Sequence, residues 1–81
     1  MEEKVREIVA AHGKLAVDPW ALGVSDDLFA AGMTSHASVN VMLALEDEFD
    51  VEFPDESLKR ATFATIRAMS DVIDKLVTEA A

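Results

Sequence analysis

Residues 27–35 read DLFAAGMTS and lead into the segment that decides the fold. At its end, Thr34 or Ser35 supplies the side-chain hydroxyl that is favoured at a helix N-cap. The residues from 39 to 45 are mostly apolar, so that a helix formed by them would be apolar over most of its circumference. We therefore predict a long central helix that starts at Thr34 or Ser35, runs to about Phe49 and is buried on several sides.

The segment before the central helix predicts a first helix and a long connection. Val5, Ile8 and Val9 follow the spacing of an amphipathic helix over about Glu3–Lys14. The connection that follows is too long to lack structure in a compact domain, and we expect short capped turns in it. One of these begins with Asp18 and Pro19, and another spans residues 25–32. We expect the following apolar residues to pin this connection to the core: Leu15, Val17, Trp20, Leu22, Leu28 and Phe29.

The segment after the central helix predicts two more helices. Pro54 cannot continue a helix, and Asp55 can cap a short third helix over about Glu56–Arg60. Thr65 can cap a last helix, in which apolar residues recur at spacings of three and four. The predicted fold class is all-α: a single domain over residues 1–81, built as a small four-helix bundle with a long loop between helices 1 and 2 and a short third helix.

Composition excludes several classes of function. The chain has 81 residues, no cysteine and a formal net charge of -9. Such an acidic surface repels nucleic acid and anionic lipid, and it attracts basic protein surfaces. We find no apolar run that could cross a membrane, and the acidic N-terminus is unlike a signal peptide, so we expect no membrane insertion and a cytoplasmic monomer.

The order of three motifs resembles the acyl and peptidyl carrier proteins. That family has a D-x-F-x-x-L-G-x-[DT]-S-L motif before its long second helix, and Gly32 and Ser35 match the motif in register. Residues 45–55, which read LEDEFDVEFPD, resemble the acidic end of the family's second helix. Residues 63–69 resemble the start of its fourth helix. Together the matches extend over nearly the whole chain.

The resemblance implies a cofactor and a set of partners. Ser35 would receive 4'-phosphopantetheine, donated by coenzyme A, from a phosphopantetheinyl transferase, which would make the chain a phosphoprotein. The arm would hold an acyl or aminoacyl group as a thioester, loaded by an acyl- or aminoacyl-loading ligase and passed to a downstream transferase. A phosphodiester at a helix N-terminus lies beside unpaired N–H groups and the positive end of the helix dipole, so the position suits its charge.

Departures from the family pattern indicate an unusual set of partners. His36 stands where the family usually has Leu, and the front of the central helix is more polar than in carriers of fatty-acid synthesis. We expect Met33 to be exposed beside the arm. We therefore hypothesise a specialised pathway rather than general fatty-acid synthesis. The residues expected to contact partners are Met33, Thr34, His36, Asn40, Glu46, Asp47 and Glu48.

Other functions fit less well. With two histidines, no cysteine and no paired polar motif, the chain offers little from which to build a catalytic or metal site, and we expect no enzyme activity. The acidic run fails as a calcium loop, because counting from Asp47 places Glu52 and Leu58 where glycine and glutamate are needed. The alternative that stays open is an unmodified helical protein-interaction module that retains the carrier fold.

Overall fold

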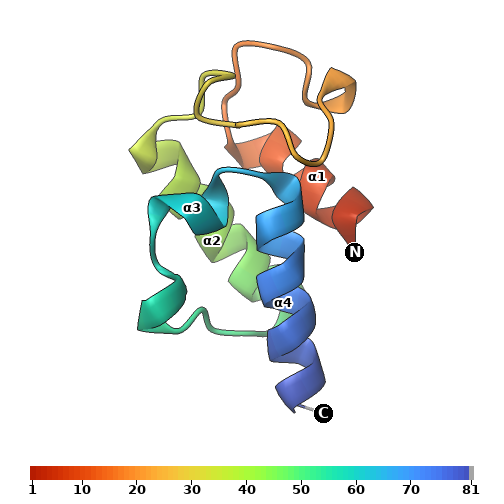
Figure 1. Ribbon diagram of the computed structural model, residues 1–81, viewed down its shortest axis with the longest axis vertical. Helices are drawn as coiled ribbons and strands as arrows, with labels where there is room; N and C mark the ends of the chain where they lie inside the picture. Colours follow the sequence, from red (N-terminus) through yellow and green to blue (C-terminus); the bar gives the residue numbers. More distant parts are fainter. Residues whose placement is uncertain (81) are drawn as a thin grey trace.

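A computed structural model describes residues 1–80, and this part of the chain is helical, with no β-strand (Figure 1). The predicted all-α class and the four-helix arrangement are therefore confirmed. Two short 3-10 helices, η1 and η2, lie in the connections. The elements in chain order are α1 (Glu2–His12), η1 (Pro19–Ala21), α2 (Ser35–Phe49), η2 (Asp55–Ser57), α3 (Arg60–Phe63) and α4 (Ile66–Ala80).

The core lies between one face each of α1, α2 and α4. In α4, Ile66, Met69 and Ile73 are fully buried, as the spacing of apolar residues predicts. The prediction that α2 is buried on several sides is wrong, because Val39 and Leu43 are 49% and 53% exposed. The stripe of α2 that carries Val39 and Leu43 is not covered by any other element within residues 1–80, so it presents these apolar side chains to solvent. The other buried core residues of these helices are Val5, Ile8, Val9, Ala37, Val41 and Leu45.

The long connection between α1 and α2 is tied down by some of its apolar residues but not by all. Leu28 is fully buried, and its N–H donates to the carbonyl of Ala64, just after α3, at 2.7 Å. By contrast, Trp20 and Val17 are 54% and 46% exposed, so the expectation that they anchor the loop is wrong. The backbone at Trp20 is held instead by the Asp18 cap, which accepts the Trp20 N–H at 3.0 Å and leaves the indole outside.

The turn at residues 25–32 forms without becoming a helix. The side chain that caps these turns is Asp27, which accepts the N–H of Phe29 at 2.9 Å, and a series of hydrogen-bonded turns follows. The chain then passes through Gly32 into α2. The half-buried apolar residues of the connection that pack against the core are Leu15, Leu22, Val24 and Phe29.

The third helix differs from the sequence prediction. A helix over Glu56–Arg60 capped by Asp55 is wrong: Asp55 begins η2, and α3 starts only at Arg60. The extended backbone of Lys59, with φ -141° and ψ 159°, separates the two elements. Burial explains the shift, since starting α3 later places Phe63 in the core with its ring 5.5 Å from that of Phe53.

Arg6 is the polar link between α1 and the long connection. Its Nη1 donates to the carbonyl of Pro19 at 2.7 Å and also to that of Leu22. Both acceptors are backbone carbonyls in or beside η1, and the Arg6 side chain is half-buried. The guanidinium therefore fixes where the connection crosses α1.

We expect Arg6→Met to lower the free energy of unfolding by about 1.5–3 kcal/mol, the range expected for hydrogen bonds that involve a charged group. Methionine keeps an apolar side chain similar to the stem of arginine, so the loss of stability measures the contribution of the two Arg6 hydrogen bonds. Urea unfolding measures it, and amide exchange should accelerate within residues 13–34. The matched control is Arg67→Met, since Arg67 is exposed and its side chain has no hydrogen bond within residues 1–80. An equal loss in both variants would contradict the assignment.

Candidate functional site

Ser35 is the first residue of α2, and its hydroxyl is free of hydrogen bonds within residues 1–80. The helix cap is Thr34, whose extended backbone and Oγ1, which accepts the N–H of Ala37 at 3.0 Å, meet the requirements of an N-cap. The Ser35 side chain is exposed, and its hydroxyl has no hydrogen bond with any of residues 1–80. Because the neighbouring threonine does the capping, Ser35 is available for chemistry.

The start of α2 carries an uncompensated positive end of the helix dipole. Ala37 and Ser38 donate to the side chain and the carbonyl of Thr34, so the amides of Ser35 and His36 are the ones that helix geometry leaves without a partner. The first turn of α2 contains no acidic residue. A negative group attached to Ser35 would therefore be stabilised by the helix end.

Gly32 sets the approach of the chain to this helix start. Its φ of +113° is a conformation that residues with a Cβ rarely adopt. A Cβ added there would lie 2.8 Å from the N of Ala16 and 3.0 Å from its Cβ. Ala16 also donates to the carbonyl of Ala31 at 2.9 Å. Gly32 is thus the point at which the segment before Ser35 packs on the segment after α1.

A cavity of about 460 Å³ opens beside Ser35, between α2 and α3. Most of its wall is apolar, and Ser38 and Ser35 contribute hydroxyls from α2. Two cations, Lys59 and Arg60, stand at the α3 side. Sequence reasoning missed both cations, although two adjacent basic residues after a long acidic run were a visible signal. The apolar wall consists of Phe29, Val39, Met42, Leu58 and Phe63.

The residues at the N-terminal end of α2 that were expected to contact partners differ in their exposure to solvent. Thr34 and His36 are exposed next to Ser35. The expectation for Met33 is wrong, because this side chain is only 3% exposed. The N–H of Met33 donates to the carbonyl of Leu28 at 3.0 Å, and this turn directs Met33 into the core. Its side chain is therefore closed to partners.

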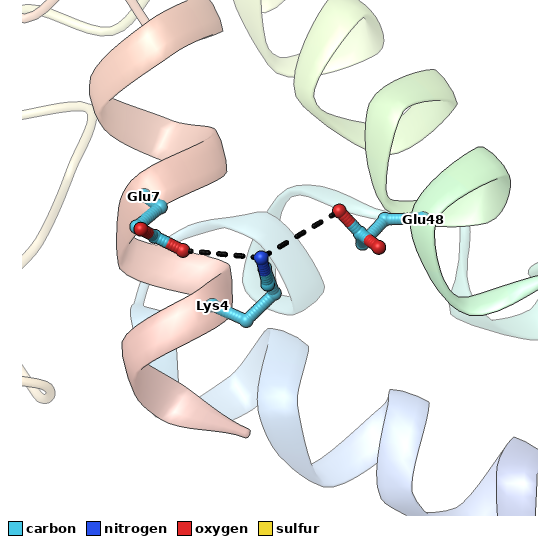
Figure 2. Close-up of polar contacts among 3 residues, drawn as sticks. All are labelled: Lys4, Glu7 and Glu48. Atoms are coloured by element: carbon cyan, nitrogen blue, oxygen red, sulfur yellow. Dashed lines mark ion pairs between the residues drawn. The ribbon is translucent and has the colours of Figure 1, made fainter.

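The acidic residues of α2 have different neighbours. Glu46 accepts the N–H of Phe53 at 2.9 Å, so its carboxylate holds the segment after α2. Glu48 lies 3.8 Å from the ammonium of Lys4 on α1, which also lies 3.3 Å from Glu7 (Figure 2). Asp47 is exposed and has no ion pair within residues 1–80. Two of the three acids thus have a structural role, which their sequence position did not reveal.

The hydrogen bond to Glu7, followed by the charges of Glu7 and Glu48, raises the pKa of Lys4. A raised pKa in the folded state means that the stabilisation is present below the ordinary pKa of lysine and is lost only as the pH rises through the raised value. Lys4 is exposed, so solvent screens this contribution. The link between α1 and α2 therefore persists through neutral pH.

A second groove lies on the other side of α2, facing α1. Asn40, Asp47 and Glu48 line it together with His12 of α1 and the exposed Leu43. The expected contact residues therefore divide between two faces: Thr34 and His36 beside Ser35, and Asn40, Asp47 and Glu48 toward α1. The sequence did not lead us to expect Val39 and Leu43 as exposed apolar residues, because we expected α2 to be buried on several sides.

Two kinds of site are not found in the described part of the chain. Residues 1–80 contain no group of three or more acidic or histidine side chains placed to hold a metal ion. None of the helices over these residues is long and apolar enough to cross a membrane.

The chain is similar to a known protein family and to curated proteins over most of its length. The family model described as the phosphopantetheine attachment site matches residues 3–73. The aminoacyl carrier protein of Agrobacterium fabrum (strain C58 / ATCC 33970) is 43% identical over 79 residues, which cover 98% of this chain and 94% of that protein. The acyl carrier protein of Thermosynechococcus vestitus is 38% identical over 74 residues, covering 89% and 82% of the two chains.

Solved structures share the fold. One is the complex of an engineered Bradyrhizobium japonicum glycine:[carrier protein] ligase with a carrier protein from Agrobacterium tumefaciens and AMP. A chain of this complex matches with a TM-score of 0.88 and 43% identity, over 91% of this chain and 99% of that one. The solution structure of an A. tumefaciens protein matches over the full length of both chains, with a TM-score of 0.77 and 42% identity.

Proposed function

This chain belongs to the phosphopantetheine-attachment family of carrier proteins, and from that premise we propose that it carries an aminoacyl group on an arm attached to Ser35. The cofactor of the family is 4'-phosphopantetheine, whose terminal thiol holds cargo as a thioester. We propose further that the chain presents this cargo to partner enzymes in a specialised pathway and catalyses no step itself. The observation that carries the proposal is the free, exposed hydroxyl of Ser35 at the uncompensated N-terminus of α2.

The residues around Ser35 fit the cofactor. Attachment forms a bond from Ser35 Oγ to the phosphorus that carries pantetheine in coenzyme A, and it breaks the pyrophosphate bond to adenosine 3',5'-bisphosphate. The hydroxyl proton leaves to a base of the transferase. The product is an anionic phosphodiester, which the free amides at the start of α2 favour. Thr34 keeps the helix end ordered without occupying Ser35.

Similarity to an aminoacyl carrier protein supports an aminoacyl cargo. The A. tumefaciens carrier of the crystal structure is bound to a glycine:[carrier protein] ligase, and this chain shares its fold at 43% identity. We propose that a ligase of this class loads the present chain and that a downstream transferase removes the cargo. The exposed apolar residues Val39 and Leu43, with His36, form the α2 surface that we assign to these partners.

Two mass measurements test the function. The wild-type chain is incubated with coenzyme A and a broad-specificity phosphopantetheinyl transferase, and its intact mass should rise by one phosphopantetheinyl group. The product is then incubated with glycine:[carrier protein] ligase, amino acid and ATP, and it should gain one aminoacyl group that hydroxylamine removes. No gain in the first step, across several transferases, would favour the unmodified interaction module. A gain only with a fatty-acyl ligase would overturn the aminoacyl assignment.

A further inference from the structure

Lys59 and Arg60 are cations that form no ion pair within residues 1–80 of a strongly acidic protein. The chain has 7 Lys and Arg against 16 Asp and Glu. Within residues 1–80 the ion pairs are those of Lys4 with Glu7 and Glu48, and neither Lys59 nor Arg60 has a carboxylate within 4.0 Å. Both side chains are exposed, and both line the cavity that Ser35 also lines. No ion pair within residues 1–80 therefore neutralises the positive charge at this cavity.

Arg60 is held in place by an aromatic ring rather than by an anion. Its guanidinium carbon lies 4.1 Å from the centroid of the Phe29 ring, and Phe29 forms part of the same cavity wall. Stacking occupies the face of the guanidinium and leaves its N–H donors, which lie in the plane, free to bind an anion. Such an arrangement reduces the conformational freedom that the side chain would lose on binding.

We propose that Lys59 and Arg60 bind the phosphate of the arm carried by Ser35. This inference rests on the proposed function, because it requires a phosphodiester at Ser35. The phosphate would add a negative charge at the cavity that these cations border, and the planar fork of Arg60 matches phosphate oxygens. The contact directs the first part of the arm toward α3 and away from the groove that faces α1.

The test compares two double variants with the same net charge. Lys59→Gln/Arg60→Gln removes the proposed contact, whereas Arg67→Gln/Lys75→Gln removes two exposed cations that do not line the cavity. Each protein is prepared in its apo and phosphopantetheinylated forms, and the Tm of each form is measured at low salt and in 1 M NaCl. The apo forms report any purely structural effect of the substitutions.

We expect modification to raise the Tm of the wild type and of the control by about 2–5 °C at low salt, the size expected for exposed ion pairs in a domain of this length. High salt should remove most of this gain because it screens the pair. The Lys59→Gln/Arg60→Gln protein should gain clearly less than the control on modification at low salt, because it keeps only the part of the gain that comes from the N-terminus of α2. In the wild type, the NMR signal of the Arg60 Nε–H should also shift on modification.

The possible outcomes separate this inference from the function on which it rests. An equal gain in both double variants would overturn the contact while leaving the arm on Ser35 intact. An unshifted Arg60 Nε–H signal in modified wild type would overturn it without relying on any variant. Absence of a mass gain on treatment with coenzyme A and transferase would overturn the function and the contact together.

Discussion

Ser35→Ala will abolish the mass gain that coenzyme A and a phosphopantetheinyl transferase give the wild-type chain. The loss should be complete rather than partial, because the substitution removes the oxygen that forms the new bond. The fold should survive, since Thr34 caps α2 and the Ser35 hydroxyl has no hydrogen bond within residues 1–80. Intact-mass spectrometry measures the modification, and circular dichroism checks that the variant is folded.

Ser38→Ala is the matched control for this experiment. Ser38 lies one turn further along α2 and borders the same cavity, but its hydroxyl donates to the carbonyl of Ser35 at 2.7 Å. We expect this variant to be modified as fully as the wild type. Modification that survives in Ser35→Ala and fails in Ser38→Ala would move the attachment site to Ser38.

Gly32→Ala should strongly destabilise the loop before α2. The added Cβ would meet backbone and side-chain atoms of Ala16 at 2.8 and 3.0 Å, in a residue whose φ is +113°. Backbone strain and overpacking together should lower the free energy of unfolding by about 2–4 kcal/mol, as measured by urea titration. The helix start next to Ser35 should be disturbed as well, so the rate of phosphopantetheinylation should fall.

Gly23→Ala provides the control for Gly32→Ala in the same connection. The nearest atom to a Cβ at Gly23 is an Asp26 carboxylate oxygen at 3.6 Å, which is ordinary van der Waals contact. We expect a change within about 0.5 kcal/mol and an unchanged rate of modification. Similar losses of unfolding free energy in the two variants would mean that any added side chain destabilises this connection. The contact of Gly32 with Ala16 would then have no special role.

The helices that could be predicted from the sequence are those fixed by local rules. The α1 and α4 spacings and the start of α2 follow from apolar periodicity and capping, and Thr65 does accept the N–H of Ala68 at 3.0 Å as a cap should. The third helix could not be placed in this way. Its position depends on burying Phe63 against Phe53, a contact between distant residues that outweighs the local cap signal of Asp55.

For the candidate site, motif register and helix capping were enough to single out Ser35, but not to describe its neighbours. Met33 turns inward because its N–H donates to the carbonyl of Leu28, and no pattern in the sequence predicts that hydrogen bond. The stacking of Arg60 on Phe29 joins positions far apart in the sequence. Such pairings arise from tertiary packing, so they become visible only when the chain is folded.

The hydrogen bond from Leu28 to Ala64 has a consequence for the width of the cavity beside Ser35. A second backbone bond, from Arg67 to Val24 at 2.9 Å, reinforces it. These two bonds tie the loop that precedes α2 to the junction between α3 and α4. An outward swing of α3 that widens the cavity between α2 and α3 would therefore have to strain or break them. Room for a bulkier group in this cavity must therefore come from rotation of flexible side chains such as Met42. Because the Met42 side chain is unbranched, its rotamer can change the depth of the cavity while the backbone keeps its width.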